Sequence, residues 1–224
     1  MRYNLNEEVF KIQSTMNRSG TVQAVLKQLR RDIVFKNLKD ETPVTELQFA
    51  EKYGCSRAAL RGALTVLEKE GLITVMPNGT KRISSLSHDD INNLYEMRTY
   101  VECSAARHIL SNDHTDISRL IKVMEDADNM DFLECDSLFH EILVDISGNK
   151  VLKQVWWTIA PVIRELFMLN FTHSEKIKDT LKERHLIISR MLLEKDEKVI
   201  DELKNHIAEA RTLSVLDKER LKIK

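Results

Sequence analysis

Glycine is distributed very unevenly along this chain of 224 residues. Five of the six glycines lie at positions 20, 54, 62, 71 and 79, which leaves only Gly148 in the last 138 residues. Glycine supplies the left-handed backbone conformations of tight turns and hairpins, so these features belong to the first part of the chain. The second part is expected to consist of long helices with few breaks.

The composition is that of a folded protein without a membrane span. Apolar residues make up 42% of the chain and charged residues 31%, which excludes wholesale disorder. No run approaches the roughly 18 consecutive apolar residues of a transmembrane helix, and Glu7 and Glu8 stand where a signal peptide would need apolar residues. The three cysteines, Cys55, Cys103 and Cys135, are far apart, so we interpret them as free thiols of a cytoplasmic protein.

Charge divides the chain at about the same place as glycine. Residues 1–86 hold 14 basic and 9 acidic residues, a net charge of +5 (14 − 9), and the remaining 138 hold 20 and 26, a net charge of −6 (20 − 26). A basic block joined to an acidic one suggests a polyanion-binding part and a part with another task. We therefore expect an N-terminal arm over residues 1–18, a polyanion-binding domain over 19–86 and a second domain over 87–224.

Three short helices are predicted in the first domain. Apolar residues recur at helical spacing over residues 21–34. Thr45 and Gln48 fit a capping box that starts a second helix, and Ser56 is expected to cap a third helix, which Gly71 ends. A helix, a tight glycine turn and a second helix form the unit that enters the major groove of DNA.

The third helix carries two arginines that could read DNA. Arg57 and Arg61 are four residues apart, so their side chains project together. An arginine can pair two donors with guanine or clamp a phosphate. A pair of arginines alone is just as typical of a solvated helix face, so the prediction depends on the whole ordered set of helices and hairpin.

A β-hairpin is predicted directly after the third helix. Residues 72–75 and 81–83 are the expected strands, and Asn78-Gly79 between them is a strong hairpin signal because both residues tolerate positive φ. Such a hairpin would be a wing that places Lys81 and Arg82 near a phosphate backbone or minor groove. We expect Asn78, Gly79 and Lys81 of this wing to bind DNA. By itself, an Asn-Gly pair is usually only a turn.

A resemblance to a known family is carried by the segment FAEKYGCSRAALRGALTVLEKEGLITVMPNGTKRI. It resembles the GntR family of bacterial transcription regulators, whose pattern contains Ser-Arg-x-x-x-Arg, then Glu-Gly-Leu and a wing glycine. The resemblance implies that Ser56, Arg57 and Arg61 face double-stranded DNA and that Gly79 lies at the tip of the wing. A palindromic operator would require a homodimer. Gly62 departs from the pattern, and should weaken its helix by roughly 1 kcal/mol relative to alanine.

Six helices with short connections are predicted for the second domain, which makes an antiparallel bundle the expected architecture. Their ranges are 87–110, 115–127, 130–146, 150–171, 174–195 and 197–220. Ser87 and Asp90 are expected to open the first helix, Asn149 to cap the fourth, and Pro161 to kink it. The fold class is therefore mainly α: a winged helix-turn-helix of three helices and a β-hairpin wing, followed by an antiparallel six-helix bundle.

Four residues of the bundle form a candidate metal site. Asp136 and His140 are four apart on one predicted helix, and His185 and His206 each lie about 10 residues from a turn near Asp196, at a similar height. One carboxylate and three imidazoles would suit Zn²⁺, Ni²⁺, Mn²⁺ or Fe²⁺, with zinc expected in the purified protein. A helical histidine is more often a surface or hydrogen-bonded core residue, and that alternative stays open.

The second domain also resembles a known ligand-binding domain, called FCD, over residues 88–215. The resemblance is carried by Arg98 in YEMRTYVE and by the metal candidates in DSLFHEILVDISGN, KERHLIISRM and LKNHIAEAR. It implies that the four candidates coordinate a divalent metal and that Arg98 helps to bind a small carboxylate effector. We expect such an effector to modulate DNA binding.

Three functions are compatible with these features. The first is a transcription regulator, not an enzyme, that binds a metal and an organic acid and responds to the acid. The second is a metal-dependent enzyme with an appended DNA-binding domain, although no further catalytic constellation such as His-Glu-x-x-His is present. The third is a structural DNA-binding protein with a metal-free bundle.

Overall fold

The structure is a computed structural model that describes residues 20–170 and 175–220. The expected N-terminal arm, residues 1–18, lies outside the described residues. The chain divides between Ser85 and Leu86 into two compact units, one residue before the boundary expected from the sequence. Each unit is described by itself.

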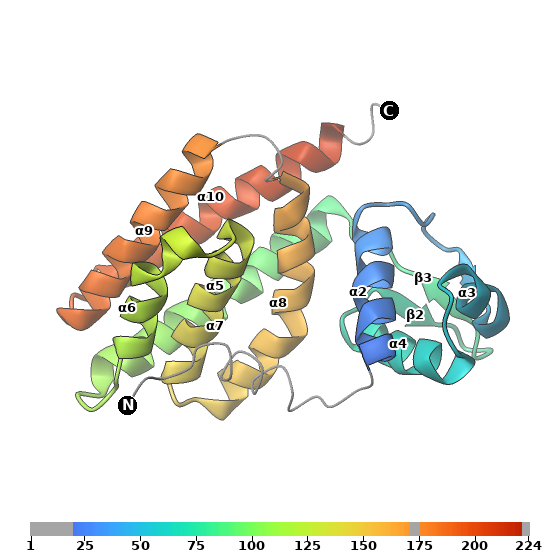
Figure 1. Cartoon of the computed structure of the whole chain (residues 1–224), viewed down its shortest axis with the longest axis horizontal. Helices are drawn as coiled ribbons and strands as arrows, with labels where there is room; N and C mark the ends of the chain where they lie inside the picture. Colours follow the sequence, from blue (N-terminus) through green and yellow to red (C-terminus); the bar gives the residue numbers. More distant parts are fainter. Residues whose placement is uncertain (1–19, 171–174, 221–224) are drawn as a thin grey trace. The chain divides into compact units, whose positions relative to one another are not determined.

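The N-terminal unit, where it is described, combines three helices with a small antiparallel sheet of strand order β1-β3-β2 (Figure 1). Its elements are α2 (Gly20–Val34), β1 (Pro43–Val44), α3 (Glu46–Lys52), α4 (Arg57–Lys69), β2 (Ile73–Val75) and β3 (Lys81–Ile83). The apolar stripe of α2 packs against that of α4, with Leu29, Ile33 and Leu60 at 0% exposure. Burial of these stripes supplies the hydrophobic free energy of this unit. The predicted winged helix-turn-helix is therefore present.

Close packing of α2 against α4 explains the unexpected glycine. A Cβ atom at Gly62 would lie 3.3 Å from Cγ1 of Val22 on α2. Glycine at position 62 lowers the helix propensity of α4, but the absence of a side chain lets α2 and α4 approach closely. Across the same pair of helices, Arg30 of α2 donates two hydrogen bonds of 2.8 Å to the carboxylate of Glu70.

Of the two helix caps predicted for the N-terminal unit, one is confirmed and the other is wrong. Ser56 caps α4 as predicted, because its hydroxyl accepts a hydrogen bond of 3.1 Å from the backbone N–H of Ala59. The predicted capping box at α3 is wrong. Thr45 is the N-cap, but its hydroxyl donates to the Gln48 side chain at 2.7 Å and no side-chain cap bond to the backbone forms there. The two side chains satisfy each other instead.

The hairpin between β2 and β3 is present, but its turn differs from the predicted one. The N–H of Gly79 donates to the carbonyl of Met76, and the N–H of Met76 donates to the carbonyl of Thr80, both at 2.8 Å. Pro77 and Asn78 are therefore the central residues of the turn. Among the residues from Met76 to Thr80, only Gly79 has positive φ, at +80°. Proline suits this turn because its fixed φ matches the first central position.

A third strand that the sequence did not predict completes the sheet. β1 pairs antiparallel with β3, with Pro43 opposite Arg82 and Val44 opposite Lys81. A two-residue strand is too short for a periodic pattern, and its proline is tolerated because β1 lies at the edge of the sheet.

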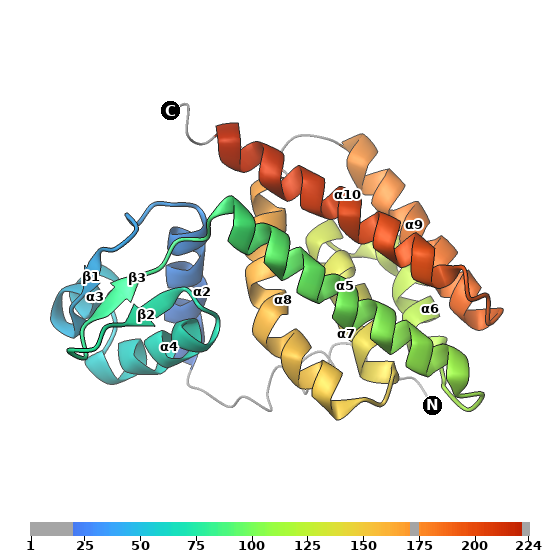
Figure 2. The same ribbon diagram turned by 180° about the vertical axis from the view of Figure 1, so that it is seen from behind.

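Over its described residues, the C-terminal unit is a bundle of six α-helices, as predicted, in which α5 and α10 run side by side (Figure 2). The helices are α5 (His88–Ser111), α6 (Ser118–Glu125), α7 (Phe132–Ile146), α8 (Lys150–Asn170), α9 (Glu175–Leu193) and α10 (Val199–Arg220), with a 3-10 turn, η1 (Ala127–Asn129), after α6. The capping box of Ser87 and Asp90 opens α5. Asn149 caps α8 by accepting from the N–H groups of Val151 and Leu152.

Helix boundaries around α6 and α7 differ from the predicted ones. The predicted helix over 115–127 is shorter and ends in the 3-10 turn. The predicted helix over 130–146 begins two residues later, because Asp131 serves as its N-cap and accepts from the N–H groups of Leu133 and Glu134. α8 includes Pro161 within its span, and the predicted ends at Phe171 and Ser174 lie outside the described residues.

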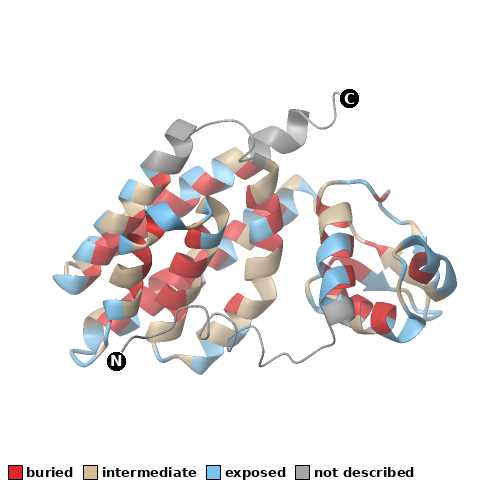
Figure 3. Cartoon of the chain, in the orientation of Figure 1, coloured by how far each residue is buried: buried red, intermediate tan, exposed pale blue. Residues whose placement is uncertain are grey.

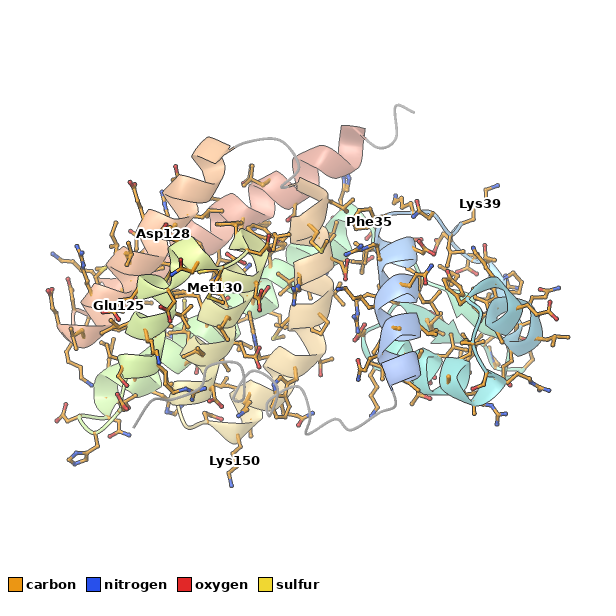
Figure 4. All side chains as sticks on the ribbon, viewed as in Figure 1. Phe35, Lys39, Glu125, Asp128, Met130 and Lys150 are labelled. Atoms are coloured by element: carbon orange, nitrogen blue, oxygen red, sulfur yellow. The ribbon has the colours of Figure 1, made fainter. Side chains whose placement is uncertain are left out.

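Buried residues face the interior of each unit and exposed residues face outward (Figure 3). With all described side chains drawn, Lys150 at the start of α8 extends away from the bundle, whereas many other side chains fill the space between the helices (Figure 4). The bundle interior also holds charged groups: Arg98, Glu102 and Asp136 are all buried. None of the described helices is both long and apolar enough to cross a membrane.

Candidate metal centre and DNA-reading surface

The four predicted metal ligands converge at the centre of the bundle. Asp136 and His140 project from one face of α7, His185 comes from α9 and His206 from α10. One ligand atom from each residue lies within 4.8 Å of all the others, and all four residues are buried. The predicted equal height of His185 and His206 across the α9–α10 turn is therefore realised: their Nε2 atoms are 3.2 Å apart.

The spacing of these atoms fits a transition metal. Nε2 of His206 is 3.2 Å from Nε2 of His140, and Oδ1 of Asp136 is 3.7 Å from Nε2 of His140 and 3.6 Å from Nε2 of His185. Neighbouring ligands bound at about 2.0–2.2 Å around one ion would be about 3.0–3.5 Å apart. The histidine pairs match this range, and the Asp136 carboxylate would move slightly closer. Imidazole and carboxylate donors are also those that zinc and its neighbours prefer.

Arg98 determines which nitrogen of His140 carries the proton. Its Nη2 lies 2.7 Å from Nε2 of His140, and an arginine can only donate. Nε2 of His140 is therefore an acceptor, and its Nδ1–H donates to Oε2 of Glu102 at 2.6 Å. The hydrogen bond from Arg98 uses the Nε2 lone pair, so an ion bound by His140 would take the place of Arg98 there.

The nitrogen atoms of His206 cannot all form hydrogen bonds with the neighbours that they have in the cluster. Nε2 of His206 contacts the Nε2 atoms of both His185 and His140. One hydrogen on Nε2 of His206 can serve only one of these two contacts at a time. The Nδ1 atom of His206 is buried without a hydrogen-bond partner among the described residues. A cation at the centre would satisfy all the converging lone pairs together.

Burial keeps two of the imidazoles neutral. Desolvation, aided by the proximity of His140, lowers the pKa of His185 to about 3. Desolvation together with the proximity of His185 and His140 lowers the pKa of His206 well below its ordinary value. Neutral imidazole is the form that binds a metal, so these two residues need not lose a proton at neutral pH.

The carboxylates of the site stay ionised although they are buried. Burial by itself would raise the pKa of Asp136, but the hydrogen bond with His140 and the charge of Arg98 hold it below its ordinary value. Glu102 behaves alike: its interactions with His140 and Arg98 outweigh desolvation and lower its pKa. Both side chains are thus anions that require positive partners.

Glu102 is a site residue that the sequence analysis missed. Its side chain is 0% exposed; one oxygen accepts from Nε of Arg98 and the other from Nδ1 of His140, each at 2.6 Å. It lies four residues after Arg98 on α5, so the spacing of an arginine and a glutamate on one helix face was the available signal. Only the fold could place this pair against α7.

Aromatic residues form the walls around the site. The ring of Phe139 stacks on that of His185, with centroids 4.0 Å apart. On α5 the buried Tyr95 shares a 2.7 Å hydrogen bond with Ser214 of α10, and the Arg98 guanidinium lies 5.8 Å from the centre of the Tyr95 ring. The Phe139 contact restricts the movement of the His185 ring, which would hold an ion.

The N-terminal unit presents the predicted arginines on its surface. Arg57 and Arg61 of α4 are exposed, with side-chain exposures of 63% and 61%, and both contact the carboxylate of Glu46 on α3. Ser56 is exposed beside them, and its hydroxyl serves as the cap of α4. The predicted set of three residues therefore lies together at the start of α4.

The predicted wing residues lie on the hairpin. Asn78 is a central residue of its turn and Gly79 follows it; the Asn78 side chain accepts a 3.0 Å hydrogen bond from the N–H of Thr80. Lys81 is half-buried and donates a 2.6 Å hydrogen bond to Glu68 of α4. The wing lysine is thus held by an acid, as the two arginines of α4 are.

Together, these features define a class of protein. A winged helix-turn-helix followed by a helical domain with a buried polar centre is typical of a ligand-responsive transcription regulator. Residues 21–82 match the family described as "Bacterial regulatory proteins, gntR family", and residues 93–209 match the FCD domain. The chain belongs to the GntR family of DNA-binding transcription regulators and carries an FCD domain; it is not an enzyme.

Individual relatives agree with this family. The HTH-type transcriptional regulator YdhC of Bacillus subtilis is 27% identical over 173 residues, which cover 73% of this chain and 77% of the relative. The gluconate operon transcriptional repressor of Bacillus licheniformis is 26% identical over 187 residues, 79% of this chain and 73% of the relative. The structure of E. coli McbR/YncC superimposes with a TM-score of 0.64 at 15% identity, covering 90% of this chain and 100% of that one, and so shares the fold.

Proposed function

We propose that this regulator binds a small carboxylate at a divalent transition metal in its C-terminal unit, and that the carboxylate modulates DNA binding. The observation that carries the proposal is the convergence of four buried ligand atoms within 4.8 Å beside a buried arginine. Asp136, His140, His185 and His206 would hold the ion. When bound, it would supply positive charge and open coordination positions for an anion.

The buried charges support both ligands. Desolvation is outweighed by the charge of Glu102, which raises the pKa of His140, but the hydrogen bond from Arg98 requires an unprotonated Nε2 and therefore a neutral His140. With three neutral histidines, Arg98 contributes +1 while Glu102 and Asp136 contribute −1 each, so the centre carries −1. Buried uncompensated charge is costly, which favours a cation. Adding a divalent ion changes the sum to +1, which one carboxylate would neutralise. Arg98 has a guanidinium nitrogen 2.7 Å from His140, and in this proposal it would clamp that anion.

The N-terminal unit is proposed to read DNA through the start of α4 and the wing. Ser56, Arg57 and Arg61 would face the major groove, and Asn78, Gly79 and Lys81 the phosphate backbone or minor groove. Five net positive charges are few for tight binding, so a homodimer on a palindromic operator would double the contacts.

Chain connectivity offers a route between the two activities. α5 begins at His88, directly after the N-terminal unit, and the same helix carries Arg98 and Glu102. An anion that binds Arg98 would compete with the hydrogen bonds that Arg98 donates to Glu102 and His140, and so would alter how α5 is held against α7. Such an effector shifts DNA binding only by its difference in affinity between two states of the dimer.

Metal content tests the first half of the proposal. Protein purified without chelator should contain about one equivalent of a transition metal per chain, zinc first, measured by mass spectrometry of the elements. His206→Ala should lose it, and the exposed His114→Ala should keep it. A full equivalent in His206→Ala would place the metal elsewhere. A wild-type chain that neither contains nor takes up Zn²⁺, Ni²⁺, Mn²⁺ or Fe²⁺ would favour the metal-free structural protein.

Thermal unfolding with a panel of short mono- and dicarboxylates tests the effector. At least one acid should raise the melting temperature of the metal-loaded wild type and change its affinity for DNA. Arg98→Lys should weaken the response to that acid and leave DNA binding without the acid intact. An equal response in Arg98→Lys would exclude Arg98 from the effector site.

DNA affinity tests the reading surface. A duplex selected from a randomised library by the wild-type chain serves as the probe. Arg57→Ala or Arg61→Ala should cost roughly 1–3 kcal/mol of binding free energy on this duplex, whereas Arg107→Ala, an exposed change in the other unit, should cost nothing. Unchanged binding by both arginine variants would refute the assignment of α4.

A further inference from the structure

We infer that Glu46 is a positioning residue for DNA reading: its carboxylate holds Arg57 and Arg61 in the arrangement with which they contact a base pair. The inference rests on the proposed DNA-reading role of α4. Glu46 is the first residue of α3, and nothing in its local sequence marks it for this role.

The geometry joins one carboxylate to both arginines. Oε1 of Glu46 lies 3.2 Å from Nε of Arg61, and Oε2 lies 3.6 Å from Nη2 of Arg57. The Glu46 side chain is 33% exposed, about half the exposure of either arginine. The carboxylate is therefore more shielded from solvent than the two guanidinium groups that it contacts.

The two contacts leave different donors available. Arg61 uses Nε, so both of its Nη groups stay free and can form the two-pronged contact with O6 and N7 of guanine. Arg57 contacts the carboxylate through Nη2 at 3.6 Å, an ion pair too long for a hydrogen bond, so part of its terminal fork lies beside an acid. The contact geometry thus favours Arg61 as the base-reading arginine and Arg57 as a phosphate or single-bond contact.

The negative charge of Glu46 should lower the affinity for DNA unless the carboxylate contributes to recognition. A carboxylate beside phosphate groups repels them and lowers affinity for any DNA sequence. Exposed ion pairs contribute little to folding stability. A negative charge at the start of α3 also interacts favourably with the helix dipole, but that effect would not depend on the DNA sequence.

Two opposite changes should follow from removal of this charge. Without Glu46 the arginine side chains become more mobile, and ordering them on a base pair costs more. Sequence-specific affinity should therefore fall, while the affinity for unrelated DNA should stay equal or rise because a repulsive charge is gone. A residue that only stabilised the fold would lower both affinities together.

The experiment compares Glu46→Gln with a matched control, Glu51→Gln. Glu51 is an exposed carboxylate on the same helix, about 140° further around its axis at 100° per residue. Binding is measured for the full chain on the library-selected duplex and on a scrambled duplex of equal length and composition. Glu46→Gln should lower the ratio of the two affinities about tenfold, and Glu51→Gln should leave the ratio unchanged. Thermal unfolding of each variant checks the fold.

A double-mutant cycle with Arg61→Ala separates the possible failures. If Glu46 acts through Arg61, Glu46→Gln should have little further effect on the ratio in the Arg61→Ala background. Full additivity of the two changes, or equal ratios in Glu46→Gln and Glu51→Gln, would overturn the positioning role. If Arg61→Ala alone binds the selected duplex as the wild type does, the proposed role of α4 fails first.

Discussion

Glu102 offers the sharpest test of how the bundle prepares His140 for a metal. Its two carboxylate oxygens accept from Nδ1 of His140 and Nε of Arg98, each at 2.6 Å, in a fully buried position. Glu102→Gln keeps the size of the side chain but replaces one of these acceptors with an NH₂ group that can only donate. The substituted amide has a single acceptor oxygen for the two donors, so one of the two contacts is lost.

Either outcome weakens metal binding. If the amide donates to Nδ1 of His140, the proton moves to Nε2 and blocks the lone pair that the ion needs. If the amide nitrogen faces Arg98 instead, a charge-assisted hydrogen bond worth about 1.5–3 kcal/mol is broken. Partners of metal-binding histidines typically contribute about 10–100-fold in affinity, which corresponds to about 1.4–2.7 kcal/mol. We therefore expect Glu102→Gln to weaken zinc binding by that factor.

Competition with a chromophoric chelator measures the zinc affinity of chelator-stripped protein. Glu96→Gln is the control, because Glu96 is an exposed carboxylate on the same helix that bonds to Tyr100. Circular dichroism of the metal-free variants checks folding, and Glu102→Asp, which keeps the charge, serves as a second variant with a smaller expected loss. Zinc affinity in Glu102→Gln equal to that of Glu96→Gln would refute the argument that Glu102 orients His140.

Three further measurements probe other contacts. In metal-free protein the pKa of His185 is about 3 in the folded chain and 6.5 in the unfolded chain, so between these values only the unfolded chain binds a proton there. The free energy of unfolding therefore falls as pH is lowered below about 6.5. His185→Gln should reduce this loss by roughly 1 kcal/mol per pH unit between pH 6 and 5, measured by urea titration. An unchanged slope would contradict burial of a neutral imidazole. Glu70→Ala removes the buried partner of Arg30 and should lower the unfolding free energy of the N-terminal unit by about 3 kcal/mol, and a loss no larger than that of an exposed glutamate would contradict this. Tyr95→Phe removes the hydrogen bond to Ser214 and should cost about 1 kcal/mol in the same titration, and no loss would mean that the bond contributes nothing net.

Local sequence signals located most of the elements. The apolar stripes, the Ser56 cap and the glycine-ended helices predicted the helices of the N-terminal unit, because these features act within a few residues. β1 was missed and the hairpin turn was assigned to the wrong pair of residues. Both depend on partners: β1 exists only because β3 pairs with it, and Pro77 moved the turn one residue back.

The candidate metal site shows the same division. The four-residue spacing of Asp136 and His140 and the turn between His185 and His206 follow from helix periodicity, so the sequence by itself could select these residues. Their convergence to within 4.8 Å required α7, α9 and α10 to pack together. Glu102 and Glu46 escaped notice because a carboxylate on a helix is ordinarily solvated. Only tertiary packing put one beside a histidine in a dry interior and the other in contact with two arginines, since the partner of a charge is decided by neighbours in space rather than along the chain.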